Sequence, residues 1–176
     1  MKWLPFAILA LVMLAVQATV GGLLGIALGD GLLLGVDFLA ILAVLVGMKT
    51  RAGTDALLAG WMLGLLIDLA SPRMPIGLYA LTFSLATSLV YYARGSIFTT
   101  NPVSQMLMTF GFVAVAHGAA RLFIHLVAPP AGSRLGLDLV EALLLAMCSA
   151  AAAPLVMGVL HKLDWLFLVQ RSGRRE

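Results

Sequence analysis

The chain has 176 residues, of which 62% are hydrophobic and only 11% are charged. A composition this apolar excludes an ordinary water-soluble protein, because most of the chain needs lipid as its solvent. The formal net charge of +3 does not indicate nucleic-acid binding, since the basic residues fall between the apolar stretches and act as topology signals. The single cysteine, Cys148, excludes both an intrachain disulfide and a cysteine metal cluster.

Six apolar stretches predict a single transmembrane domain of six helices, an all-α polytopic membrane protein. A membrane-spanning helix needs about 20 residues, so the length leaves room for six spans and short loops but no sizeable soluble domain. The expected spans cover residues 3–28, 33–48, 55–70, 75–93, 102–127 and 137–160, followed by a basic cytoplasmic tail over 161–176.

The first stretch allows two interpretations. Val16-Gln17-Ala18 would pass as a signal-peptidase site, which would make residues 1–18 a cleaved leader. The sequence past Ala18, however, stays apolar through Leu28 and never becomes a polar mature start. We therefore favour an uncleaved first span, in which Gln17 is an interhelical hydrogen-bond partner.

Capping and turn residues mark where several spans begin. Residues 29–31, Gly-Asp-Gly, predict a turn before the second span, and Asp37 falls in that span's opening turns. Thr54 is expected to cap the third span. Asn101 followed by Pro102 is a start signal for the fifth span, because asparagine caps a helix and proline suits its first position.

The distribution of basic residues predicts that both termini are cytoplasmic. With the N-terminus inside, eight Lys or Arg residues fall on the inner side and two on the outer side, which is the imbalance expected of cytoplasmic loops. The inner residues are Lys2, Lys49, Arg51, Arg94, Lys162, Arg171, Arg174 and Arg175, and the outer residues are Arg73 and Arg134. The acidic residues expected at the outer end are Asp30, Asp37, Asp68, Asp138 and Glu141.

Residues 60–81 predict a helical hairpin. Gly60 and Gly64 lie one turn apart and let a neighbouring backbone come close, as helices in lipid require. Asp68 is costly in hydrocarbon, so it must sit near the water boundary or meet a partner inside the bundle. Pro72 cannot continue the first helix, while Pro75 can begin the next one.

A face of the fifth span carries polar side chains. His117, Arg121 and His125 are spaced four apart and therefore share one helix face. They are expected to meet other polar residues, and the intramembrane polar cluster is predicted to contain Gln17, Asp37, Asp68, His117, Arg121, His125 and Glu141. Such a cluster could be a ligand site, a proton path or a foothold for a partner's helix. We prefer the simpler explanation that Arg121 is neutralised so that the bundle can close.

The chain carries no motif of a known reaction. His117 and His125 are about 12 Å apart along one helix, which is too far to chelate one ion. The sequence contains no HExxH zinc motif, GxSxG nucleophile elbow, Walker A loop or dinucleotide fingerprint. We therefore predict no catalytic residues, no metal, no cofactor and no enzyme activity.

Residues 60–102 carry the pattern G-x-x-x-G-x-x-x-D-L-x-S, a short turn, P-x-G-x-x-A-L and, farther on, a basic residue and N-P. These positions are Gly60, Gly64, Asp68, Leu69, Ser71, Pro75, Gly77, Ala80, Leu81, Arg94, Asn101 and Pro102. The pattern resembles that of the MreD family of bacterial rod-shape-determining membrane proteins. Gln17 and Asp37 fit the family more weakly. Length, six spans and the basic tail fit as well.

The resemblance implies a non-catalytic, multi-pass scaffold of the cell-elongation machinery in the bacterial cytoplasmic membrane. Such a protein would bind MreC, a single-span protein, and work alongside MreB, RodA and a penicillin-binding transpeptidase to direct lateral peptidoglycan synthesis and rod shape. The outer turn at 71–76 and the small-residue faces at Gly60 and Gly64 become candidates for gripping the MreC span. The candidate partner or packing interface consists of Gly60, Gly64, Asp68, Ser71, Pro75 and Gly77.

Two other functions remain open. The six-span layout is similar to the substrate-binding membrane subunits of vitamin importers of the energy-coupling-factor type, whose small ligand sits in an outward-facing pocket. Such a pocket would here be formed by Asp37, Asp68, Arg121, His125 and Glu141. The third function, proton-coupled transport along the face of His117 and His125, rests on polar spacing alone.

Overall fold

A computed structural model of the chain describes residues 2–24, 26–28, 32–71, 75–96, 101–127 and 135–167. Within these ranges the chain forms six α-helices and one pair of short strands. The helices are α1 (Trp3–Leu24), α2 (Phe38–Lys49), α3 (Gly53–Ala70), α4 (Leu78–Ala93), α5 (Pro102–Val127) and α6 (Leu135–Phe167). The strands are β1 (Ile26–Leu28) and β2 (Leu32–Leu34), and a 3-10 turn, η1 (Arg94–Ser96), follows α4.

Three of the described helices are long and apolar enough to cross a membrane. They are α3, α5 and the part of α6 from Leu135 to Lys162. The apolar part of α1 (Trp3–Thr19), α2 and α4 are shorter. The prediction of a largely helical membrane protein is thus confirmed by the length and composition of these three helices.

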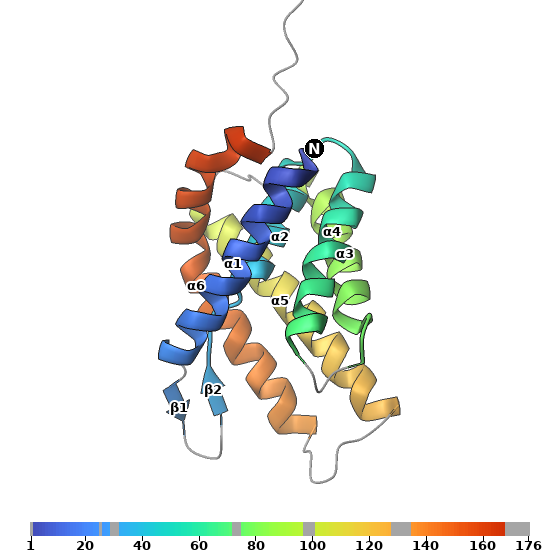
Figure 1. The fold of residues 1–176 in the computed structure, drawn as a ribbon. Coiled ribbons are helices and arrows are strands. Elements are labelled where there is room, and N and C mark those ends of the chain that lie inside the picture. Colours follow the sequence, from blue (N-terminus) through green and yellow to red (C-terminus); the bar gives the residue numbers. More distant parts are fainter. Residues whose placement is uncertain are drawn as a thin grey trace, which may run out of the picture.

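The helices form one bundle with α2 near its centre (Figure 1). Helices α3 and α4 pack side by side as a hairpin, and α5 packs along α6. The start of α1 and the end of α6 lie at the same end of the bundle, and β1 and β2 lie at the opposite end (Figure 1).

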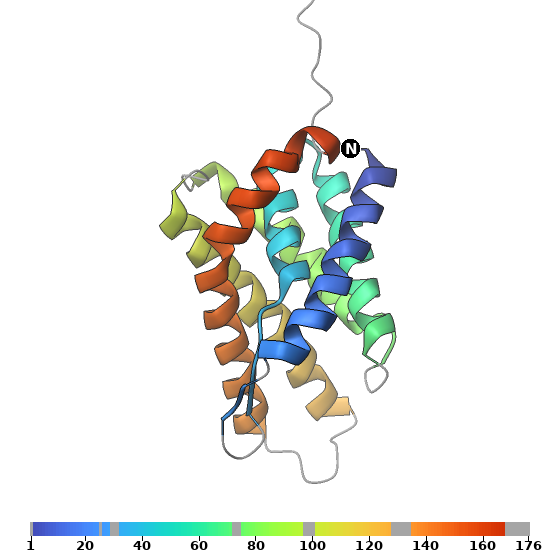
Figure 2. The ribbon, with the colours of Figure 1, turned by 60° about the vertical axis from the view of Figure 1, so that its left-hand side comes forward.

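Helix α2 is the core of the bundle. All ten residues from Leu39 to Met48 are buried, so the helix is apolar and covered on every side. Its 12 residues give a length of about 18 Å, which is less than the hydrocarbon thickness of about 30 Å. Figure 2 shows the chain rising from β2 to α2, which begins inside the bundle.

The predicted end of the first span and start of the second are wrong. Helix α1 ends at Leu24 instead of Leu28, and α2 begins at Phe38 instead of Leu33. Between them β1 pairs antiparallel with β2, Leu28 opposite Leu32, so the chain is not purely α. The reason is the glycine content of residues 21–35, since each glycine costs a helix about 1 kcal/mol relative to alanine. The predicted turn at 29–31 lies outside the described residues.

The starts of α3 and α4 also differ from the predictions. Helix α3 begins at Gly53, with Ala52 at its N-cap and no capping side chain, so Thr54 is not the cap. Helix α4 begins at Leu78 instead of Pro75. Residues 75–78 instead form a turn, in which the Pro75 carbonyl accepts the Leu78 N–H at 3.3 Å. The helix therefore begins three residues later than predicted.

The limits of the last two helices are closer to the predictions. Helix α5 covers Pro102–Val127, as predicted, and Asn101 Oδ1 accepts the Val103 N–H at 3.0 Å. The N-cap prediction is thereby confirmed. Helix α6 extends beyond the predicted 137–160 in both directions. The predicted basic residues of the tail beyond Phe167 lie outside the described residues.

Glycines bring α4 close to its neighbours. A Cβ on Gly64 would lie 2.5 Å from the Tyr79 carbonyl carbon and 2.6 Å from Ala80 Cα. A Cβ on Gly60 would lie 2.7 Å from the Phe83 carbonyl oxygen. No real Cβ fits at such distances, so both positions require glycine. The predicted hairpin with a small-residue contact is confirmed, and its contact surface lies within the chain.

Candidate functional site

Asp68 caps the start of α4 from the end of α3. The Asp68 carboxylate is 2% exposed and accepts three backbone N–H groups, from Gly77 at 2.9 Å, Tyr79 at 3.0 Å and Ala80 at 3.0 Å. The first N–H groups of a helix have no partner within the helix, and a carboxylate is favoured beside them. Asp68 therefore caps the start of α4 and stabilises the α3–α4 hairpin.

Gly77 explains why this cap comes from another helix. Gly77 is the N-cap residue of α4 and has φ of +100°, in the left-handed region that glycine enters at no steric cost. Glycine has no side chain with which to cap a helix. The carboxylate of Asp68, nine residues earlier, takes that place.

A second buried carboxylate begins α2. Asp37 is the N-cap residue of α2, 1% exposed, and its Oδ1 accepts the Ala40 N–H at 2.9 Å. Gln17 Oε1 from α1 accepts the Leu39 N–H at 3.1 Å. The Asp37 N–H donates to Ser149 Oγ of α6 at 2.9 Å. Because α2 starts inside the bundle, its orphan N–H groups need these side chains in place of water.

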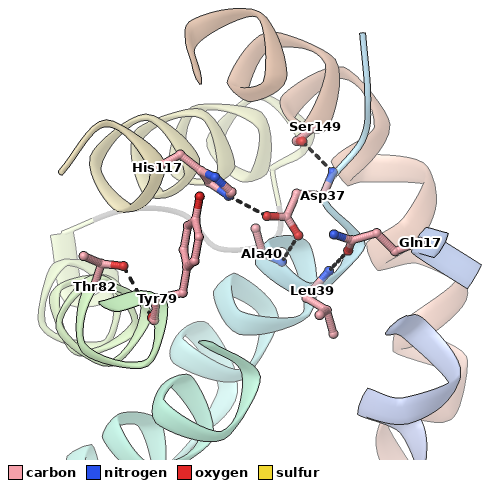
Figure 3. Close-up of polar contacts among 8 residues, drawn as sticks. All are labelled: Gln17, Asp37, Leu39, Ala40, Tyr79, Thr82, His117 and Ser149. Carbon is pink, nitrogen blue, oxygen red and sulfur yellow. Dashed lines mark hydrogen bonds and ion pairs between the residues drawn. The ribbon is translucent and has the colours of Figure 1, made fainter. Parts of the chain in front are cut away.

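His117 of α5 completes this network. Its Nε2 lies 2.7 Å from Asp37 Oδ2, a distance at which an imidazole N–H donates to a carboxylate. The His117 ring packs against Tyr79 and Phe83 of α4, with ring centroids 5.1 and 6.0 Å away. Figure 3 shows Gln17, Asp37, His117 and Ser149 converging from four helices around the start of α2. We call these four residues the α2-start network.

Arg121 belongs to a separate pair. Its Nη1 donates to Glu141 Oε2 of α6 at 2.5 Å and lies 3.9 Å from Asp138 Oδ1. The Arg121 Nε is buried with no hydrogen-bond partner within the described residues. The expectation that Arg121 is neutralised is confirmed by its pair with Glu141.

Hydrogen bonds join some residues of the predicted polar cluster in separate sets. Gln17, Asp37 and His117 meet at the start of α2, and Arg121 meets Glu141. Asp68 accepts the backbone N–H groups at the start of α4, and His125 lies half-buried in the last turn of α5.

The proposed interface residues of the hairpin have mostly internal contacts. Gly60, Gly64 and Asp68 contact α4, and Ser71 is the C-cap of α3, its N–H donating to the Asp68 carbonyl at 3.2 Å. Pro75 is exposed at the turn before α4. A partner's helix cannot share the glycine face, because α4 already covers it.

Sequence reasoning missed Ser149 and Tyr79. Ser149 lies in an alanine-rich run that indicates close packing, and it is the only hydroxyl residue between 139 and 160. That isolation was the available signal, since a hydroxyl amid apolar residues in lipid needs a hydrogen-bond partner. Tyr79 had no such signal, because aromatic side chains are common in apolar helices.

No protein-family model, curated protein or solved structure matches this chain. Within the described residues no group of three or more His, Cys, Asp or Glu side chains could hold a metal ion.

The pairing of Asp37 with His117 can be measured. We expect Asp37→Ala to lower the free energy of unfolding by about 2–4 kcal/mol, because it removes a helix cap and leaves His117 buried without its partner. His117→Ala in the Asp37→Ala background should cost much less than His117→Ala alone, with a coupling energy of about 1–3 kcal/mol. Unfolding of the four proteins in detergent gives this cycle. Additive effects would show that the two side chains do not interact.

Proposed function

We propose that this protein is a non-catalytic scaffold of the MreD type, which binds MreC and helps to direct lateral peptidoglycan synthesis. The observation that carries the proposal is that three residues of the resemblance form one structural unit. Gly60 and Gly64 bring α3 against α4, and Asp68 caps α4 from α3. These residues therefore determine how α3 and α4 pack as a hairpin. A fixed hairpin gives a scaffold a defined surface for binding its partners.

The contact with MreC would use the outer face of this hairpin. The glycine face is covered by α4, whereas Leu81, Leu85 and Leu89 of α4 are 58%, 61% and 62% exposed. Residues four apart share one helix face, so these leucines form an apolar stripe about 12 Å long on α4. We name Leu81, Leu85 and Leu89 the α4 stripe.

The orientation proposed for the scaffold places both termini in the cytoplasm of a bacterium, with the protein in the inner membrane. The described basic residues Lys2, Lys49, Arg51, Arg94 and Lys162 fall at the start of α1, the end of α2, the turn after α2, the end of α4 and near the end of α6. Figure 1 shows the start of α1 and the end of α6 at the same end of the bundle. Contacts join these segments, since Arg94 Nη1 donates to the Met48 carbonyl at 3.3 Å and Lys49 Nζ to His161 Nδ1. A concentration of Lys and Arg at one end favours the cytoplasmic side. We call it the basic end.

Purification of the tagged protein from its native membrane tests the proposal. Mass spectrometry of the retained proteins should find MreC, with or without RodA, the transpeptidase and MreB. Recovery of an ATPase and a transmembrane coupling subunit, together with a retained small molecule, would instead make the protein a vitamin-type importer subunit.

Two matched variants locate the contact. Replacing Leu81 and Leu85 together by alanine should reduce the MreC recovered severalfold. Replacing Leu155 and Val159 of α6, which are 77% and 63% exposed, should leave MreC recovery unchanged. Both pairs are one turn apart on an exposed face, so they remove similar apolar area. Equal recovery from both variants would place the contact elsewhere.

A further inference from the structure

A cavity of about 290 Å³ lies between α2, α5 and α6 near the basic end, beside Lys49. Its wall includes Leu45, Met48 and Lys49 of α2, Pro102 and Gln105 of α5, and Pro154, Met157, Gly158 and His161 of α6. None of these residues belongs to the α2-start network or to the Arg121 pair. The volume is near the lower limit of about 300–1,000 Å³ for sites that hold small molecules.

The cavity has an apolar floor and a polar mouth. Leu45, Met48 and Met157 are at most 7% exposed, so the floor is buried hydrocarbon. Lys49 and Gln105 are half-buried, and His161 is exposed. A ligand that fits this arrangement has an apolar part and a polar head.

Proline shapes the wall formed by α6. Pro154 lies inside α6, where it has no N–H to donate to the carbonyl four residues earlier. Prolines are a usual cause of bends in helices, and Figure 1 shows that α6 is not straight. We attribute the space beside Pro154 to this bend.

The charge of the mouth favours an anion. Lys49 Nζ donates to His161 Nδ1, so the ammonium and the imidazole are held together at the cavity. Helix α5 begins at Pro102, and the N-terminus of a helix carries a partial positive charge. The basic end carries five described Lys or Arg residues, and its acidic residues are Asp55 in the first turn of α3 and Asp164 near the end of α6. Basic pockets between membrane helices are sites for lipid headgroups.

We propose that this cavity binds one anionic phospholipid, with the headgroup phosphate at Lys49 and His161 and an acyl chain against the apolar floor. This proposal is independent of the scaffold function. It predicts a preference for a lipid with a net negative headgroup over a zwitterionic lipid with the same acyl chains.

The test compares palmitoyl-oleoyl phosphatidylglycerol with palmitoyl-oleoyl phosphatidylcholine added to the full chain in detergent. Native mass spectrometry counts retained lipids, and thermal unfolding measures stabilisation. The wild type should retain one phosphatidylglycerol and unfold at a higher temperature with it than with phosphatidylcholine. Lys49→Gln should weaken apparent affinity for phosphatidylglycerol about tenfold, as expected on losing a charge-assisted contact. Lys162→Gln, also at the basic end but outside the cavity wall, is the control.

A second variant fills the cavity without touching Lys49. A Cβ on Gly158 meets no atom within 4 Å, so Gly158→Leu can enter the cavity without a clash at its Cβ. It should abolish retention of phosphatidylglycerol, whereas Gly111→Leu, equally open and outside the wall, should not. Equal stabilisation by both lipids, or unchanged retention in Lys49→Gln and Gly158→Leu, would overturn the proposal. Full stabilisation by inorganic phosphate alone would overturn the assignment to a lipid.

Discussion

Replacement of Asp68 by alanine is expected to lower the free energy of unfolding by about 3–5 kcal/mol. Loss of a helix cap costs about 0.5–2 kcal/mol, and each buried N–H left without a partner costs about 1–3 kcal/mol. The carboxylate accepts from Gly77, Tyr79 and Ala80 at 2.9–3.0 Å and is 2% exposed. Water has little access to replace it, so the start of α4 should fray. Thermal unfolding in detergent and proteolysis near the turn measure both effects.

Asp138→Ala is the matched control for Asp68→Ala. The Asp138 side chain is 36% exposed and lies 3.9 Å from Arg121, which keeps its closer partner Glu141. An exposed charge pair at this distance contributes little, so we expect a change within about 0.5 kcal/mol. If the two substitutions have equal effects, the cap on α4 is not what Asp68 provides.

Replacement of Gly64 by leucine is expected to cost about 3 kcal/mol, at the upper end of the range for overpacking. Its Cβ alone would meet the backbone of Tyr79 and Ala80 at 2.5 and 2.6 Å. Backbone atoms cannot rotate away as a flexible side chain can, so α3 and α4 must separate. Recovery of MreC should fall with the loss of the hairpin, and unfolding in detergent shows whether the hairpin has been lost.

Gly111→Leu is the control for Gly64→Leu. Gly111 lies in α5, and a Cβ there meets no atom within 4 Å. Leucine is a better helix former than glycine by somewhat less than 1 kcal/mol, so this variant should be as stable as the wild type or more stable. A fold that tolerates leucine equally at both glycines would contradict the close contact between α3 and α4.

Much of the helical layout could be predicted because lipid imposes it locally. Helix α5 has the predicted limits Pro102–Val127, since its cap Asn101, its first proline and its apolar length all lie in one continuous segment. The β1–β2 pair was missed because residues 21–35 are apolar as well as glycine-rich. Apolar composition favours a span, whereas the glycines lower the helical preference enough for strand pairing to compete.

The contacts between polar residues could be predicted only in part from the sequence. Asp37 and His117 are 80 residues apart in the chain but 2.7 Å apart in space, and each had a sequence signal of its own. Their pairing was not predictable, because it depends on α2 starting inside the bundle beside α5. The cavity at Lys49 and His161 had no sequence signal, since it results from how α6 passes α2 and α5.

The sequence by itself determined that the chain needs lipid, that its helices alternate with short turns, and that its buried carboxylates require partners. These are properties of single residues and short segments in a solvent that leaves no polar group unpaired. Only the tertiary structure decided which partners they have: Asp68 caps α4, Asp37 caps α2 and holds His117, and Glu141 holds Arg121. Which partner each carboxylate contacts depends on which helix faces meet, and close packing of the whole bundle sets that arrangement.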